Sequence, residues 1–429
     1  MRGKLLVAGV AGIVAVAAMF FGGVLSELST AGKASSDSAR ARVTPAQASR
    51  IAVLERVVAR SPSDGPSLIE LGLDYQQRAR ETADPTDYGR AEAALRRGLR
   101  FGGDRYLALT GLAAVAASRH RFGVAVDLAR RAIRIDPDAE AAYGILGDGL
   151  VELGRYDEGF AAFDHMAARG SDLPALTRVS YARELLGRRR QAIVAMRMAV
   201  GMASTPENAA WTLVQLGNLE FDGNRLRAAE AAYRQALAVF PGYSHAEAAL
   251  ARIDAAHGRL AAAVRRYRDV VARMPLPQYA IALGDTLRAA DRGAEARETY
   301  RLVGAIERLF RANGVRTELE TALFDLDHGR RLRDALARAR KAYVQAPSIH
   351  AEDVLAWALL KNGRCQNARA HSVRALRLGT RDALKLFHRG MIERCLGRPG
   401  TARSFFAGAL AVNEHFSLLY APVAREALR

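Results

Sequence analysis

Cysteine and aromatic residues are scarce in this chain of 429 residues, and the common catalytic motifs are missing. The two cysteines, Cys365 and Cys395, form no CxxC pair, so neither a zinc ribbon nor a dithiol redox motif is indicated. The signatures HExxH, GxSxG, the P-loop and a strand-linked GxGxxG are absent. His350, His371, His388 and His415 do not repeat a known ligand spacing. We therefore predict no enzymatic activity, no cofactor and no metal site.

Lysine is also scarce, although the chain is basic. It holds 63 lysines and arginines against 45 acidic residues, a net charge of +18, and only five of the basic residues are lysines. A basic surface attracts nucleic acid, anionic lipid or acidic cell-wall polymer. No long basic run with interleaved aromatics is present, and the arginine excess is typical of a GC-rich genome. Nucleic-acid binding is therefore not favoured.

A small residue recurs about every 34 positions through most of the chain. The steps are 34, 34, 33, 37, 34, 33, 39, 33 and 34 along the series Ala91, Ala125, Gly159, Ala192, Ala229, Ala263, Ala296, Ala335, Ala368 and Ala402. A period near 34 indicates a helix-turn-helix repeat stacked into a solenoid. A small side chain at these positions lets two helix backbones approach closely.

Other positions keep the same register. A glycine often stands five residues before the small residue, where a tight turn between two helices needs positive φ: Gly154, Gly187, Gly258, Gly363 and Gly397. An aromatic often follows it by four: Phe163, Tyr233, Tyr267, Tyr300 and Phe406. In four units a proline stands twelve residues after the small residue. Leu-Gly pairs such as Leu216-Gly217 stand twelve residues before the small residue.

These marks together resemble the tetratricopeptide repeat (TPR) family, over roughly residues 65 to 415. The resemblance implies an all-α, right-handed α-solenoid of about ten repeats. The eighth unit departs from the pattern, with Arg330 in place of the turn glycine. The first repeat holds an insertion at 78–87, and the longer steps add residues near 201–206 and 306–315. Insertions in solenoids are expected in loops.

The N-terminus predicts a membrane anchor or a signal. Arg2 and Lys4 precede 21 uncharged, mostly apolar residues from Leu5 to Leu25, about the length that spans a bilayer. We assign residues 1–25 to a transmembrane anchor or signal peptide, 26–44 to a flexible linker, 45–62 to a capping helix, 63–415 to the solenoid, and 416–429 to a tail or capping helix. We expect a single-pass protein with the solenoid outside the cytoplasm, or a secreted one if the segment is cleaved.

The TPR resemblance also implies a ligand groove and a cysteine pair. The groove is formed by the first helix of each repeat, at positions 18, 15, 11, 8 and 7 before the small residue. Its candidate residues are Trp211, Asn218, Phe221, Arg252, Asp285, Arg288 and Trp357. For any single one of them, a packing or solvated role is the more common alternative. In such a stack Cys365 and Cys395 lie at the same pole of adjacent helices, where they either form a disulfide or remain free thiols.

The leading interpretation is therefore a non-enzymatic scaffold at the cell envelope that binds a protein or peptide partner in the groove. The alternative is a binder of an anionic polymer, either a cell-wall polymer or nucleic acid, through the basic surface. Steep salt dependence would distinguish the second from the first.

Overall fold

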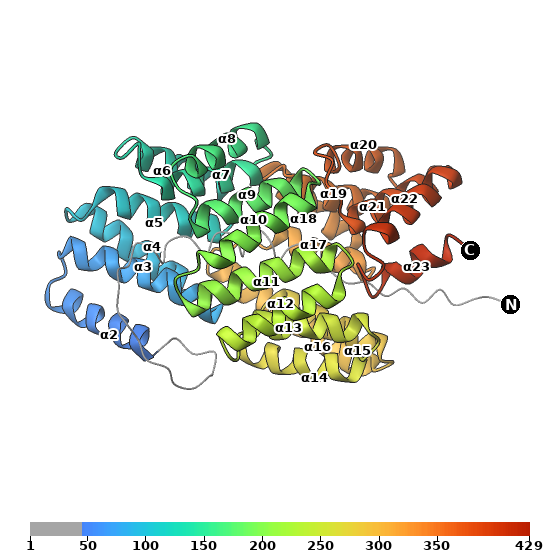
Figure 1. Ribbon diagram of the computed structural model, residues 1–429, viewed down its shortest axis with the longest axis horizontal. Coiled ribbons are helices and arrows are strands. Elements are labelled where there is room, and N and C mark those ends of the chain that lie inside the picture. The colour runs from blue at the N-terminus through green and yellow to red at the C-terminus, as the bar shows by residue number, and fades with distance from the viewer. Residues whose placement is uncertain (1–44) are drawn as a thin grey trace.

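The computed structural model describes residues 45–429, which form 22 helices and no strand (Figure 1). The expected anchor or signal at 1–25 and the linker at 26–44 lie outside the described residues. Across 45–429, no helix combines the length and apolar character needed to cross a bilayer.

Ten helix pairs follow one another, preceded by α2 and followed by α23. The bounds are α2 Pro45–Arg60, α3 Gly65–Thr82, α4 Thr86–Arg100, α5 Arg105–Ser118, α6 Phe122–Ile133, α7 Glu140–Glu152, α8 Tyr156–Ala167, α9 Leu173–Leu185, α10 Arg189–Gly201, α11 Pro206–Asp222, α12 Leu226–Val239, α13 Ser244–Ala256, α14 Leu260–Arg273, α15 Pro277–Ala289, α16 Gly293–Ala312, α17 Glu318–Asp327, α18 Leu332–Gln345, α19 Ile349–Lys361, α20 Cys365–Ala375, α21 Ala383–Cys395, α22 Pro399–Val412 and α23 Tyr420–Glu426.

The predicted register of small residues is confirmed. One falls on the second helix of every pair: the nine alanines are at most 2% exposed, and Gly159 is buried. In four repeats the aromatic residue four positions after the small residue packs on a glycine of the first helix. A Cβ added at Gly147 would lie 2.4 Å from the ring of Phe163, and one at Gly284 would lie 2.3 Å from that of Tyr300. These close approaches explain why small residues recur on both helices.

The turns between paired helices have positive φ, as predicted. φ is 72° at Gly154 and 76° at Gly258. Three repeats without a glycine there place a polar residue in the same conformation, at His120, Asn224 and Asp291. The expectation that Arg330 replaces the turn glycine of the eighth repeat is wrong. The turn glycine of this repeat is Gly329, one residue earlier, with φ 64°.

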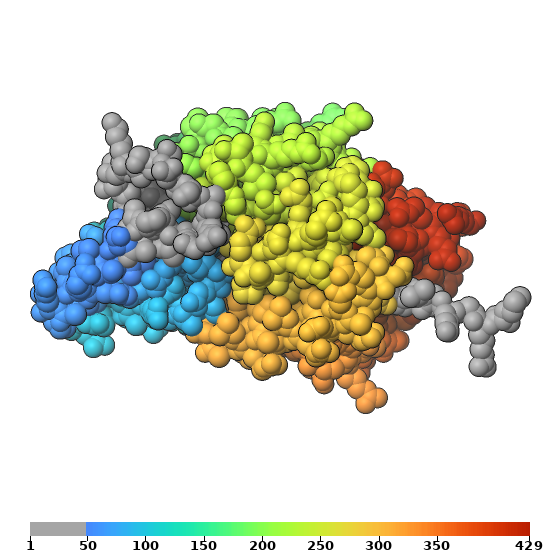
Figure 2. Space-filling view, turned by 90° about the horizontal axis from the view of Figure 1, so that it is seen from below, coloured from blue at the N-terminus to red at the C-terminus, as the bar shows by residue number. Residues whose placement is uncertain are grey.

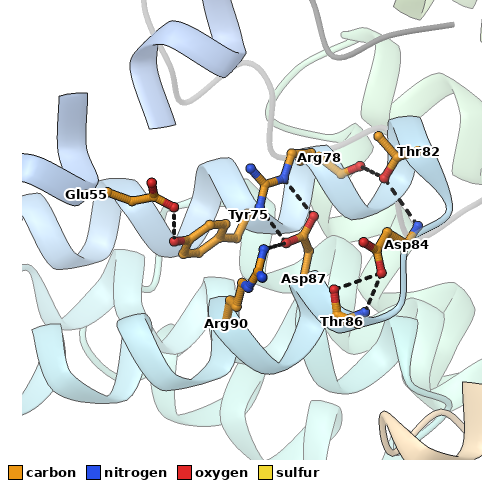
Figure 3. A network of polar contacts seen from close by, with 8 residues as sticks. All are labelled: Glu55, Tyr75, Arg78, Thr82, Asp84, Thr86, Asp87 and Arg90. Carbon is orange, nitrogen blue, oxygen red and sulfur yellow. Dashed lines mark hydrogen bonds and ion pairs between the residues drawn. The ribbon is translucent and has the colours of Figure 1, made fainter. Parts of the chain in front are cut away.

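The expectation that insertions form loops is wrong for the longest step. The extra residues near 306–315 lengthen α16 to 20 residues, and the helix ends at Ala312. The insertion in the first repeat partly extends α3 and otherwise forms an ordered turn (Figure 3). There the Arg78 guanidinium donates two hydrogen bonds of 2.7 and 2.6 Å to Asp87. Tyr75 joins α3 to α2 by a 2.6 Å hydrogen bond from its hydroxyl to Glu55.

The solenoid curves until its second half touches its first. Turns within repeats 2 to 5 meet the loops that follow repeats 7 to 10, through pairs 192 to 196 residues apart. The hydrogen-bonded pairs are His120 with the carbonyl of Arg316, the amide of Ile349 with the Tyr156 hydroxyl, Arg189 with the carbonyl of Arg381, and Asn413 with the carbonyl of Phe221. Figure 2 shows the N-terminal repeats in blue against orange segments of the second half. The two halves of the solenoid are therefore in direct contact along these turns and loops.

Cys365 and Cys395 form a disulfide in the structure, with their Cα atoms 6.1 Å apart. The bond joins the start of α20 to the end of α21, that is, the second helix of the ninth repeat to the first helix of the tenth. It closes a loop with a sequence separation of 30 residues.

Candidate functional site

A cavity of about 570 Å³ lies inside the superhelix. Its wall includes residues from the first helices of repeats 4 to 7, namely α9, α11, α13 and α15, together with the ends of α3 and α5. The C-terminal segment from Asn413 to Arg425 also contributes to the wall. The cavity thus lies on the inner surface that the TPR resemblance assigns to ligands, and later parts of the same chain line it as well.

Four of the seven candidate groove residues line this cavity: Trp211, Asn218, Phe221 and Arg252. They stand on α11 and α13, in the fifth and sixth repeats. Asp285, Arg288 and Trp357 are not among the lining residues. Arg288 is half-buried on α15.

Trp357 and Asp285 are fully buried in polar packing and cannot contact a ligand as expected. The Trp357 indole stacks on His388 and donates a 2.9 Å hydrogen bond to Asp327. Asp285 accepts a hydrogen bond of 2.5 Å from the Tyr300 hydroxyl. Asp285 also contacts His328 of the next repeat at 2.8 Å, whereas Trp357 is packed against Tyr420 from the C-terminal segment.

The C-terminal segment covers the inner faces of the last repeats. Its Tyr420 ring stacks on Phe387 with centroids 4.7 Å apart, and its hydroxyl donates a 2.9 Å hydrogen bond to Asp327 on α17. The segment expected as a tail or capping helix therefore reaches three repeats back into the superhelix. The inner surface of the middle repeats remains to form the cavity.

Arg252 is held rigidly in the wall of the cavity. Its guanidinium carbon lies 3.9 Å from the centroid of the Phe221 ring, a cation–π contact. One of its nitrogens donates hydrogen bonds of 2.8 Å to Asn218 and 2.9 Å to the Tyr233 hydroxyl. The predicted residues Asn218, Phe221 and Arg252 thus form one contact group, which positions an aromatic face and a cation side by side.

Two carboxyl groups line the same cavity, from Glu184 on α9 and Asp222 at the end of α11. Burial, followed by repulsion from Asp222, raises the pKa of Glu184 to about 8. Burial also raises the pKa of Asp222, against the opposing effect of Arg252. Glu184 is therefore mostly neutral at pH 7. It was missed by sequence reasoning, although counting eight residues back from Ala192 reaches it.

Aromatic and imidazole groups complete the wall on α13, α14 and α15. Burial lowers the pKa of His245 to about 4, so this imidazole is neutral at pH 7. Its Nδ1 is hydrogen-bonded to the Tyr279 hydroxyl. No group of three or more His, Cys, Asp or Glu side chains within residues 45–429 is arranged to hold a metal ion.

Comparisons with known proteins find TPR proteins among the solved structures. PilW, a type IV pilus biogenesis factor, is 16% identical, with 49% of this chain and 99% of that one covered and a TM-score of 0.40. PilF of Pseudomonas aeruginosa is 15% identical, covering 48% and 92%, with a TM-score of 0.38. A TPR protein of Thermus thermophilus is 16% identical, covering 52% and 99%, with a TM-score of 0.35. No family model and no curated protein matches this chain.

At these TM-scores the likenesses carry no argument about function. The repeat architecture of this chain stands on its own ten helix pairs, with their buried small residues and their turns of positive φ. The described residues are thus a TPR-like α-solenoid. In this solenoid the two halves touch each other, and a cavity of about 570 Å³ lies on the inner face.

Proposed function

We propose that this protein is a non-enzymatic interaction scaffold that binds a segment of a protein partner in its inner cavity. The observation that carries the proposal is the cavity itself, into which separate repeats bring Trp211, Phe221 and Arg252. Tryptophan and arginine are the side chains that most often dominate binding energy at protein interfaces. Because Arg252 is already ordered by its contacts, binding costs little conformational entropy at this position.

The volume of the cavity limits the size of the ligand that it can hold. About 570 Å³ lies within the range of 300–1,000 Å³ that is typical of small-ligand sites. Such a volume holds a short extended segment and not a folded domain. The partner therefore inserts a chain end or a loop, and the rest of it stays outside the superhelix.

We further propose that the scaffold acts at the cell envelope, outside the cytoplasm. The support is the basic start and apolar run of residues 1–25, together with the bond between Cys365 and Cys395, which suits an oxidising compartment. Alkaline phosphatase fused after Arg429 should be active in cells, because it requires export. Activity only of a reporter that works in the cytoplasm would contradict this location.

Crosslinking in cells tests the binding site. A photoreactive amino acid placed at Trp211 should yield a discrete crosslinked partner. The same group at Val344, which is 80% exposed on the second helix of the eighth repeat, is the matched control and should not yield it. Identical products from both positions, or none from Trp211, would contradict a cavity site.

The anionic-polymer alternative has a different signature in the same system. Polymer bound to the basic surface would dissociate steeply as salt increases. It would also be insensitive to Trp211→Ala, because that side chain lies in the cavity wall. A captured ligand that dissociates steeply with salt and is insensitive to Trp211→Ala would favour polymer binding over the scaffold.

A further inference from the structure

We propose that a cluster of arginines in repeats 9 and 10 binds a flexible polymer that carries phosphate groups and no bases. This site is separate from the cavity and goes beyond the binding of a partner segment. It lies at the end of α20, α21 and α22 where the turns of these two repeats are found, in the C-terminal part of the superhelix (Figure 1). The arginine cluster consists of Arg364, Arg369, Arg389, Arg394 and Arg398.

The net charge of the chain is concentrated in these repeats. Residues 361–412 contain 11 lysines and arginines and only two acidic residues, a net charge of +9. The much longer segment 45–360 contains 45 basic and 39 acidic residues, a net charge of only +6. A genome-wide preference for arginine adds basic residues throughout a chain and does not remove acidic residues from one part of it. Composition alone therefore does not explain this concentration of charge.

Three guanidinium groups converge on one buried carboxylate at the centre of the arginine cluster. Glu393 is 1% exposed, and it accepts hydrogen bonds of 3.1 Å from Arg369, 2.8 Å from Arg389 and 3.3 Å from Arg398. The side chains of Arg369 and Arg398 are nevertheless 42% and 46% exposed. A guanidinium group has five N–H donors, so both groups keep donors for a ligand. Because Glu393 already holds them in place, an anion binds there at a low cost in conformational entropy.

The disulfide adds two more arginines. Arg364 and Arg394 directly precede Cys365 and Cys395, whose Cα atoms are 6.1 Å apart. The bond therefore holds the backbones that carry these two arginines beside each other. Both arginines are exposed, and neither forms an ion pair with another residue of 45–429. The arginine cluster thus sets five guanidinium groups against a single carboxylate.

This end of repeats 9 and 10 is open, in contrast to the corresponding end of earlier repeats. A Cβ added at the turn glycines Gly363 and Gly397 would meet nothing within 4 Å. A Cβ added at Gly154 or Gly187, the turn glycines of repeats 3 and 4, would lie 2.5 or 2.3 Å from a backbone oxygen of the other half of the solenoid. The contact between the two halves therefore leaves the arginine cluster accessible.

Phosphate is the anion that suits this cluster, because the planar guanidinium fork binds phosphate oxygens in pairs. Proteins that bind single-stranded nucleic acid also offer aromatic rings on which bases stack. No tyrosine or tryptophan occurs in residues 361–412. The rings of Phe405 and Phe406 have the guanidinium groups of Arg389 and Arg394 over them, with carbon-to-centroid distances of 5.1 and 5.9 Å. The arginine cluster therefore favours a phosphate polymer without bases.

A bilayer surface fits less well than a polymer. Binding at the membrane interface increases with the apolar area that enters the bilayer. None of the exposed large apolar side chains of residues 45–429 lies in the turns of repeats 9 and 10. A flexible chain of phosphate groups can instead follow the guanidinium groups from α20 to α22.

Fluorescence anisotropy with labelled polyphosphate of defined length tests the proposal on the full chain in non-ionic detergent. The test variant combines Arg364→Gln with Arg394→Gln, which leaves the three hydrogen bonds to Glu393 in place. The matched control combines Arg188→Gln with Arg190→Gln. It removes the same charge from two exposed arginines, and Arg188 precedes the second helix of repeat 4 as Arg364 does in repeat 9. Equal urea midpoints establish that both variants are folded.

Salt dependence gives the expected magnitude. For a flexible strand, each phosphate contact adds about 0.7 to the slope of log K against log salt. With the four exposed or half-exposed arginines in contact, raising the salt from 50 to 200 mM should weaken binding about 50-fold. With two of them removed, the same change should weaken it about sevenfold, and the control should retain the 50-fold effect. Arg364→Lys with Arg394→Lys should keep the salt dependence and lose part of the preference for polyphosphate over polyglutamate, because an ammonium group lacks the guanidinium fork.

An unchanged salt dependence in the glutamine variant, or an equal loss in the control, would overturn the proposal. Single-stranded DNA and phosphatidylglycerol nanodiscs are tested as competitors at equal phosphate concentration. Stronger competition by either one than by unlabelled polyphosphate would also overturn it, because bases or a bilayer would then be the preferred ligand. Trp211→Ala should leave polyphosphate binding unchanged. Polyphosphate binding at the arginine cluster without a partner crosslinked from position 211 would support this inference and overturn the proposed function, and the reverse result would do the opposite.

Discussion

Adding one methyl group at Gly217 should destabilise the fifth repeat. A Cβ there would lie 2.3 Å from Cε1 and 2.6 Å from Cδ1 of the Tyr233 ring, closer than real side chains approach. The ring cannot move aside freely, because Tyr233 is fully buried and its hydroxyl donates a 2.9 Å hydrogen bond to Asn218. Overpacking of this kind costs about 1–3 kcal/mol. The better helix propensity of alanine returns up to about 1 kcal/mol.

We therefore expect Gly217→Ala to lower the free energy of unfolding by about 1–2 kcal/mol. Urea unfolding of the full chain in detergent, followed by far-UV circular dichroism, measures the shift. Gly400→Ala is the matched control, because Gly400 also lies in a helix and a Cβ there meets nothing within 4 Å. That variant should be neutral or up to about 1 kcal/mol more stable.

A double-mutant cycle identifies the cause of the loss. Tyr233→Leu removes the ring that the new methyl group would contact, so the double variant should cost less than the sum of the two single variants. Equal midpoints for Gly217→Ala and Gly400→Ala would refute the reasoning, because the close approach of glycine and tyrosine would then have no energetic consequence.

Three further predictions concern other parts of the fold. Ala263→Leu should cost about 1–3 kcal/mol by overpacking a position that is fully buried between helices, and an unchanged urea midpoint would contradict the register. Replacing both Cys365 and Cys395 by serine should cost about 3–4 kcal/mol in the chain-entropy model for a loop of 30 residues. Partial proteolysis should then begin in the C-terminal repeats, and free thiols in protein purified without reductant would remove the basis of this prediction. Glu152→Gln should stabilise the protein at pH 7 but not at pH 4, because burial, followed by Asp148, raises the folded-state pKa of Glu152 to about 8. The folded protein keeps that proton while the unfolded chain releases it, so the stability of the unmodified protein falls as the pH rises from about 4.5 to 8. The variant has no such proton and does not lose this stability. Unfolding curves of both proteins at pH 4 and pH 7 test the prediction, and equal stabilities at pH 7 would contradict it.

Several properties of the fold follow from short-range patterns and could be predicted. The period of 34 marks each helix pair, and the steps between small residues locate the second helices. The glycines five residues earlier mark the turns, because positive φ is costly for most other residues. The same counting reached Asn218, Phe221 and Arg252, which the structure brings into one contact group.

The sequence by itself therefore determined the repeat, its register and the residues on the inner face. Only the tertiary structure decided which of those residues remain accessible. Trp357 and Asp285 hold equivalent positions to Asn218 in their own repeats, yet both are buried in polar packing, and Tyr420 from the C-terminal segment packs on Trp357. The closure of the superhelix depends on small rotations that accumulate over five to six repeats until residues some 190 positions apart meet. Because each rotation is set by packing between neighbouring pairs, no local pattern reveals the sum.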